Sequence, residues 1–235
     1  MSMQNRSFVG LALIVFMSTQ PCVSRENIKT LKDQYQQKHP FHHKRDSSPF
    51  ENVEEFAAKF DDPSRDAWQK PEEIFKFIGL KNSNKLAEIG AGTGYFSFRA
   101  AWHLKYGMVY AVDSEPKMLE FIDRKVKTLG INNLKTCKSS HNSIALPEKV
   151  DAILMVNTFH HIDDRKRYIS LLKSQLVPNG KLVIVEGKPQ TPMEPPRELR
   201  VNDKQIIAEL KSAGFSLIGD SSVLPYQYLQ MFQPD

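Results

Sequence analysis

The feature that most constrains this chain is a short apolar segment, residues 85–89, that runs directly into the sequence GAGTG. Glycine has no Cβ and adopts positive φ at little cost, so Gly90, Gly92 and Gly94 predict a tight loop whose backbone can approach a bulky ligand. Residues 95–102 follow with a helical pattern, and the N-terminus of that helix faces the same crevice. The segment therefore predicts a strand, loop and helix unit that binds a ligand at its turn.

The glycine spacing separates two classes of nucleotide-binding loop. A dinucleotide-binding loop follows G-x-G-x-x-G, whereas here Tyr95 stands at the third glycine and the pattern is E-x-G-x-G-x-G, beginning at Glu88. The next apolar segment ends in Asp113, about 20 residues after Gly92, where a carboxylate can accept hydrogen bonds from both hydroxyls of a ribose. An acid at that position serves both classes, so the glycine spacing alone disfavours NAD.

Four apolar segments each end in a turn of characteristic sequence. They are LAEIGAGTG at residues 86–94, YAVD at 110–113, VDAILMVN at 150–157 and LVPNGKL at 176–182. Together they resemble the class I S-adenosylmethionine-dependent methyltransferases, from about residue 60 to the C-terminus. The resemblance implies S-adenosyl-L-methionine as cofactor, and an α/β fold with a doubly wound seven-stranded Rossmann-like sheet and helices on both faces.

Three flanking segments resemble one bacterial branch of small methyltransferases without assigned substrates. They are DDPSRDAWQKP at residues 61–71, FHH at 159–161 and LPYQY at 224–228. The branch implies methyl transfer and leaves the acceptor open, because pocket shape rather than motif determines that choice. We expect a small-molecule acceptor; a lipid, a quinone precursor or a protein side chain are the alternatives.

Strands alternate with helices in the rest of the chain, as a doubly wound sheet requires. The pattern predicts strands at residues 85–89, 108–113, 134–138, 151–156, 181–186, 215–221 and 227–232. It predicts helices at residues 49–60, 71–78, 95–102, 116–128, 163–176 and 203–213, the first laid over the cofactor pocket. The family resemblance implies that the last strand inserts antiparallel beside the sixth.

Ligands of such sheets bind beyond the carboxyl ends of the strands. Beside the glycines, we expect Glu88, Asp113 and Asn157 to contact the cofactor there. Glu88 would either anchor the glycine loop through backbone N–H groups or reach the methionine amine. Many relatives place an acid after the third strand for the adenine amino group, whereas this chain offers Asn142 or a serine, which can form a neutral hydrogen bond instead.

A histidine pair, His160 and His161, follows the fourth strand beside the expected acceptor. A neutral imidazole can deprotonate a hydroxyl or thiol, so either histidine is a candidate general base, and His160 is preferred. The alternatives are helix capping, stacking on the cofactor or shaping of the pocket, and methyl transfer can proceed by alignment alone. Residues 187–197 predict a lid over the acceptor site or a stiff connector. Arg197 and Arg200 would hold an anionic acceptor or form exposed salt bridges.

The N-terminus predicts a secretory signal peptide over residues 1–24. Arg6 precedes an apolar run, residues 8–17, that is too short to span a bilayer, and cleavage is expected after Ser24. We expect an exported, periplasmic protein whose membrane contact is limited to this leader. Without a functional leader the protein would be cytoplasmic, where the cofactor is made.

Residues 25–49 predict a flexible polar linker, and the methyltransferase domain spans residues 50–235. The linker composition cannot bury enough apolar surface to fold alone. His39, His42 and His43 lie close together, but no acidic or cysteine partner stands at ligand spacing, so no metal site is expected.

Charge excludes one further class. The chain has 32 Lys and Arg against 27 Asp and Glu, and the two signs are interspersed. A nucleic-acid interface needs a basic face interleaved with aromatic residues, so we expect no nucleic-acid partner. Two functions stay open beside methyl transfer: an NAD-dependent oxidoreductase, and a non-catalytic S-adenosylmethionine-binding protein.

Overall fold

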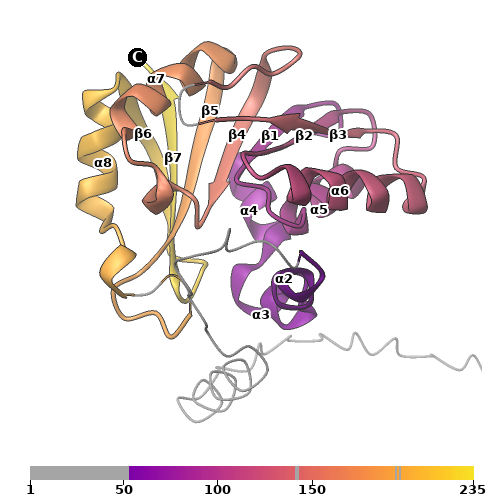
Figure 1. Ribbon diagram of the computed structural model, residues 1–235. Coiled ribbons are helices and arrows are strands. Elements are labelled where there is room, and N and C mark those ends of the chain that lie inside the picture. Colours follow the sequence, from indigo (N-terminus) through magenta and orange to yellow (C-terminus); the bar gives the residue numbers. More distant parts are fainter. Residues whose placement is uncertain (1–52, 141–142, 194, 196) are drawn as a thin grey trace, which may run out of the picture. The chain divides into compact units, whose positions relative to one another are not determined.

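A computed structural model describes residues 53–140, 143–193, 195 and 197–235 (Figure 1). The predicted leader, the predicted linker with its three histidines and the first residues of the predicted domain lie outside the described residues. Asn142, the expected adenine contact, also lies outside them.

A seven-stranded sheet forms the centre of the described fold, in the order β3-β2-β1-β4-β5-β7-β6. β7 lies between β5 and β6 and is antiparallel to both, whereas the other pairs are parallel. The strands are β1 (Lys85–Ile89), β2 (Met108–Asp113), β3 (Leu134–Lys138), β4 (Val150–Val156), β5 (Leu176–Gly187), β6 (Phe215–Ser221) and β7 (Gln227–Pro234). The predicted fold class and the insertion of the last strand are confirmed.

Helices cover both faces of the sheet (Figure 1). They are α2 (Val53–Phe60), α3 (Asp66–Gln69), α4 (Pro71–Ile78), α5 (Tyr95–His103), α6 (Pro116–Leu129), α7 (Arg165–Gln175) and α8 (Asp203–Ser212). Short 3-10 turns are η1 (Pro63–Arg65), η2 (Phe159–His161) and η3 (Arg197–Leu199). None of the described helices is long and apolar enough to cross a membrane.

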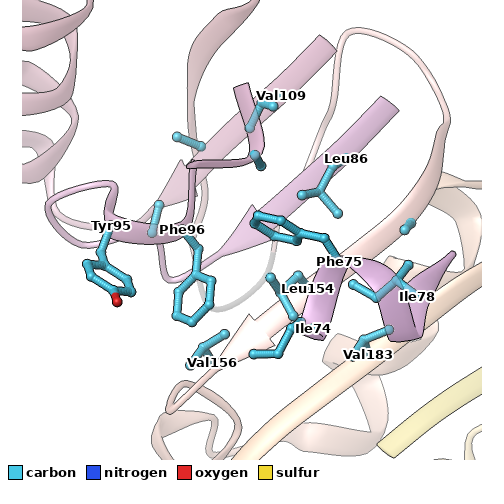
Figure 2. Packing of buried hydrophobic residues seen from close by; sticks show 14 of the residues in the cluster. Ile74, Phe75, Ile78, Leu86, Tyr95, Phe96, Val109, Leu154, Val156 and Val183 are labelled. Carbon is cyan, nitrogen blue, oxygen red and sulfur yellow. The ribbon is translucent and has the colours of Figure 1, made fainter. Parts of the chain in front are cut away.

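Each strand divides its side chains between two apolar clusters, because alternate residues point to opposite faces. Leu86 of β1 packs in the cluster that contains Phe75 of α4 and Phe96 of α5, which Figure 2 shows. Its neighbour Ala87 packs in the other cluster, with Leu172 of α7. The central parallel strands are therefore buried on both sides and rigidly held.

The parallel register brings the carboxyl ends of the central strands to one edge. Ile89 of β1 pairs with Val112 of β2, and Val156 of β4 pairs with Val185 of β5. The residues that follow these pairs, from the glycine loop to the turn after β5, therefore gather at that edge, which is where open α/β sheets bind ligands.

Candidate functional site

The glycine loop occupies the left-handed region of backbone space at each of its three glycines. The φ angles are +73° at Gly90, +55° at Gly92 and +84° at Gly94. A Cβ on Gly90 would lie 2.3 Å from Thr158 Oγ1, whereas one on Gly92 would meet nothing closer than Phe60, at 3.7 Å. Gly90 is thus required by its contact with the turn after β4, and Gly92 by its backbone conformation.

Asp113 joins the end of β2 to the glycine loop, a contact that its spacing did not predict. Its Oδ2 accepts a hydrogen bond from Gly92 N at 2.8 Å, and its Oδ1 accepts one from Glu115 N at 3.0 Å. Burial raises the pKa of Asp113, while these backbone donors act in the opposite direction. The carboxylate therefore sets the loop conformation at the position expected to contact a ribose.

Glu88 lies under the loop and is fully buried. The Ser97 hydroxyl, in the first turns of α5, donates to Glu88 Oε2. Burial raises the pKa of Glu88 to about 8, partly offset by the Ser97 hydrogen bond and the charge of Arg65. Glu88 thus joins β1 to α5. Among the described residues, it forms no hydrogen bond with the backbone of the glycine loop.

The segment that follows α2 contacts the glycine loop and the start of α5, whereas the predicted position of the first helix over the cofactor pocket stays a prediction. Asp61, just after α2, accepts a hydrogen bond from Thr93 Oγ1 at 2.7 Å and pairs with Lys125 Nζ at 2.7 Å. The ring of Tyr95 lies between two guanidinium groups, 3.9 Å from Arg65 and 3.7 Å from Arg99. These contacts were not predicted, although the segment DDPSR had been singled out by resemblance.

Asn157 ends β4 in a left-handed conformation, with φ at +50°. Its backbone N donates to Val185 O at 2.9 Å, and its Oδ1 accepts from Gln227 Nε2 at 2.9 Å. The structure thus brings Asn157, the glycine loop and Asp113 to one edge of the sheet. Thr158, the residue after Asn157, packs against Gly90 of the loop.

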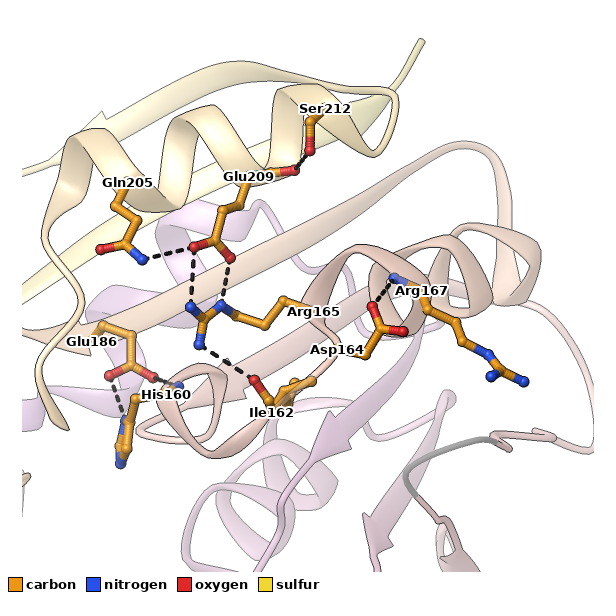
Figure 3. Close-up of polar contacts among 9 residues, drawn as sticks. All are labelled: His160, Ile162, Asp164, Arg165, Arg167, Glu186, Gln205, Glu209 and Ser212. Atoms are coloured by element: carbon orange, nitrogen blue, oxygen red, sulfur yellow. Dashed lines mark hydrogen bonds and ion pairs between the residues drawn. The ribbon is translucent and has the colours of Figure 1, made fainter.

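His160 forms a buried pair with Glu186, which ends the apolar part of β5 (Figure 3). His160 Nδ1 lies 2.8 Å from Glu186 Oε2, and their side chains are only 2% and 0% exposed. Because a carboxylate oxygen accepts, we assign the proton to Nδ1, which leaves the Nε2 lone pair available. The ring of His161 lies 4.0 Å from that of His160. Glu186 was not predicted from the sequence. Its only recognisable feature there is its position, an acidic residue directly after the apolar run LVIV.

Comparisons with known proteins agree on one family. A methyltransferase-domain family model matches residues 87–182. An uncharacterised methyltransferase of Exiguobacterium sibiricum is 26% identical over 171 residues, which is 69% of this chain and 73% of that protein. A solved S-adenosylmethionine-dependent methyltransferase of Aquifex aeolicus is 29% identical, with a TM-score of 0.72 over 77% of this chain and 97% of that one.

The chain is a class I S-adenosylmethionine-dependent methyltransferase. The methyltransferase shares its fold more widely: the [4+2]-cyclase SpnF is 14% identical with a TM-score of 0.61, covering 71% of this chain and 80% of the cyclase. That likeness shows the fold alone, since one fold hosts different reactions. Family membership, rather than the fold, disfavours the oxidoreductase and the non-catalytic alternative.

The proline-rich loop of the methyltransferase after β5 is held by Arg200. The guanidinium donates to the carbonyl oxygens of Pro189, Met193 and Pro195, at 2.7, 3.1 and 2.9 Å. The half-buried guanidinium of Arg200 thus shapes the loop through backbone carbonyls, a role that was not predicted from the sequence. Among the described residues, no group of three or more His, Cys, Asp or Glu side chains could hold a metal ion.

Proposed function

We propose that the methyltransferase holds S-adenosylmethionine between the glycine loop and Asp113. We propose further that it methylates a small molecule at the carboxyl ends of β4 and β5, beside the start of β7. The observation that carries the proposal is the hydrogen bond from Gly92 N to Asp113 Oδ2, which joins loop and carboxylate. When bound, the cofactor supplies an activated sulfonium methyl group. The protein then has to orient the acceptor and take its proton.

The proposed cofactor contacts are Gly90, Gly92, Gly94 and Asp113, with Asp113 accepting from the ribose. The positive φ angles of the three glycines, which let the backbone approach a bulky ligand, support a ligand at the loop. Glu88 supports the site from beneath, through α5. Asn142 stays a proposed adenine contact.

We propose His160 as the general base and Glu186 as the residue that positions it. The Nδ1 to Oε2 hydrogen bond fixes the ring, as in a base that is oriented by a carboxylate. The free Nε2 can then take a proton from the acceptor as the methyl group arrives.

Label transfer tests this function before the acceptor is known. The full chain, incubated with methyl-labelled S-adenosylmethionine and the small-molecule fraction of a cell extract, should label a compound of that fraction. His160→Gln should lower the label at least about tenfold while keeping affinity for S-adenosylhomocysteine. Exposed His161 is the neighbouring comparison, and His161→Gln should lower it less. Label found only in protein, or equal labelling by His160→Gln, would contradict the proposal.

We also propose that the leader directs export to the periplasm. The support is sequence alone: Arg6, the short apolar run and the small residues near Ser24. Cell fractionation, with mass spectrometry of the N-terminus, should find a periplasmic protein that begins near Arg25. A cytoplasmic protein with an intact N-terminus would overturn export and leave methyl transfer untouched.

A further inference from the structure

Two flanking segments that the proposed function leaves unused meet beside β4. They are the sequences WQ at the end of α3 and YQ at the start of β7. The rings of Trp68 and Tyr226 have centroids 6.3 Å apart. The residues that follow these two aromatic residues are also in contact, because Gln69 Nε2 donates a hydrogen bond of 3.4 Å to Gln227 Oε1. We call these four residues the α3–β7 junction.

The hydrogen bonds of the junction can have only one polarity. Arg65 Nε lies 2.6 Å from Gln69 Oε1, and a guanidinium only donates, so the amide oxygen of Gln69 must face it. Gln69 then donates with Nε2 to Gln227, which in turn donates with its own Nε2 to Asn157 Oδ1 at 2.9 Å. Amide orientations are ordinarily assigned from the surrounding network, and here the arginine fixes all three.

The last amide of the series, Asn157, is left with a donor. Within the described part of the chain its Nδ2 has no hydrogen-bond partner, and the residue is half-buried at the end of β4. A series of bonds that begins at a cation polarises each following amide, which strengthens the final donor. The edge where ligands bind therefore presents an N–H group at this point.

A second unused donor lies in the same junction. Trp68 is 9% exposed, and its indole Nε1 is buried without a hydrogen-bond partner among the described residues. Buried donors in folded proteins nearly always have an acceptor. The two unpaired groups, Trp68 Nε1 and Asn157 Nδ2, are both hydrogen-bond donors. An oxygen atom of a ligand would therefore satisfy them, whereas an ammonium group would not.

We infer that the methyl acceptor presents an unprotonated oxygen, a carbonyl or a carboxylate, to Asn157 Nδ2 and the Trp68 indole. The inference rests on the proposed function and deepens it by naming a chemical class for the acceptor. The junction lies on the β5 and β7 side of β4, whereas Asp113 ends β2 on the other side of β1. The junction thus lies on the proposed acceptor side of β4, away from Asp113, and the inference assigns Asn157 to the acceptor in place of its expected contact with the cofactor.

Two fragments of opposite polarity test the inference directly. Benzoate offers only oxygen acceptors, and benzylammonium only donors. The chain has two tryptophans, so a ¹H–¹⁵N correlation NMR spectrum of the S-adenosylhomocysteine complex shows two indole N–H signals. Millimolar benzoate should shift the signal of Trp68 and leave that of Trp102, which is 59% exposed, unchanged. A shift by benzylammonium of equal size, or none by benzoate, would overturn the inference.

Two matched variants identify the donor. Asn157→Asp keeps the oxygen that accepts from Gln227 but loses the N–H group, so benzoate affinity should fall at least about tenfold. Asn179→Asp makes the same change at another left-handed asparagine, φ +63°, exposed near the start of β5, and should have no effect. Equal benzoate affinity of both variants would contradict the inference.

Cofactor affinity separates this inference from the proposed function. Asn157→Asp should bind S-adenosylhomocysteine as the wild type does. 5′-Methylthioadenosine lacks the amino-acid carboxylate of S-adenosylhomocysteine. If Asn157→Asp lost tenfold or more of its affinity for S-adenosylhomocysteine but kept its affinity for 5′-methylthioadenosine, the donor would belong to the cofactor site and the inference would be overturned. Failure of the wild type to bind S-adenosylhomocysteine would instead overturn the proposed function.

Discussion

Gly90 is the residue of the glycine loop that tolerates a side chain least. Gly90→Ala places a Cβ 2.3 Å from Thr158 Oγ1 at a φ of +73°, so both overpacking and backbone strain lower the free energy of unfolding. Gly130→Ala has a similar φ, +64°, but nothing within 4 Å of the new Cβ, so it reports strain alone. Strain costs about 1–2 kcal/mol and overpacking a further 1–3 kcal/mol.

Urea unfolding should therefore show a larger loss for Gly90→Ala than for Gly130→Ala, by at least about 1 kcal/mol. Thr158→Ala, added to Gly90→Ala, should recover part of the difference because it removes the two closest atoms. Equal losses in the two single variants would show that the turn after β4 does not press on the loop.

Glu88 makes the stability of the protein depend on pH. Its pKa rises from an ordinary value of 4.5 to about 8, so the folded protein keeps a proton that the unfolded chain releases. The free energy of unfolding should fall as pH rises from about 5 to about 8, with Glu88 accounting for about 3 kcal/mol of that fall. Glu88→Gln keeps an acceptor for Ser97 and should remove this part of the slope. Parallel pH profiles for the two proteins would show that Glu88 titrates normally.

At this scale the sequence predicted residues whose roles follow from local spacing. The positions of the glycines, Asp113 and His160 could be predicted because strand ends and turns can be placed along the chain, whereas their contacts with the cofactor and the acceptor stay predictions. Glu186 was missed because its partner, His160, is brought beside it only by the pairing of β4 with β5. An acid at a strand end has no visible partner until that register is known.

At the scale of elements, Arg200 turns the proline-rich loop into a defined structure. Arg200→Ala removes donors to three carbonyl oxygens and should speed hydrogen exchange and proteolysis in residues 189–195. Arg200→Lys should behave similarly, because one ammonium group cannot reproduce the planar fork. Exposed Arg197 provides the control, and Arg197→Ala should leave the loop protected. Equal exchange in Arg200→Ala and the wild type would contradict this role.

Most element positions could be predicted, and the exceptions have a physical cause. β5 begins at Leu176, whereas its predicted start was residue 181, because Pro178, Asn179 and Gly180 have the composition of a turn. Leu176 nevertheless pairs with Val150 before a shift in register, so the strand includes the turn-like residues. Tertiary pairing here overrides local propensity.

At the scale of the whole described fold, the family resemblance supplied the sheet order that periodicity could not. The α3–β7 junction shows the limit of both. Gln69 and Gln227 are 158 residues apart in the chain, and their contact depends on β7 inserting between β5 and β6. The two segments were recognised as marks of a branch, but only the fold shows that they form one wall beside Asn157.

The most direct test of the central claim is calorimetry of S-adenosylhomocysteine with the full chain. Binding should be in the micromolar range, and Asp113→Ala should weaken it at least about tenfold, because hydrogen bonds to a charged group contribute about 1.5–3 kcal/mol each. Asp220→Ala, at an exposed carboxylate on β6, should bind like the wild type. No wild-type binding at millimolar ligand, tighter binding of NAD, or an unchanged affinity in folded Asp113→Ala would contradict the account.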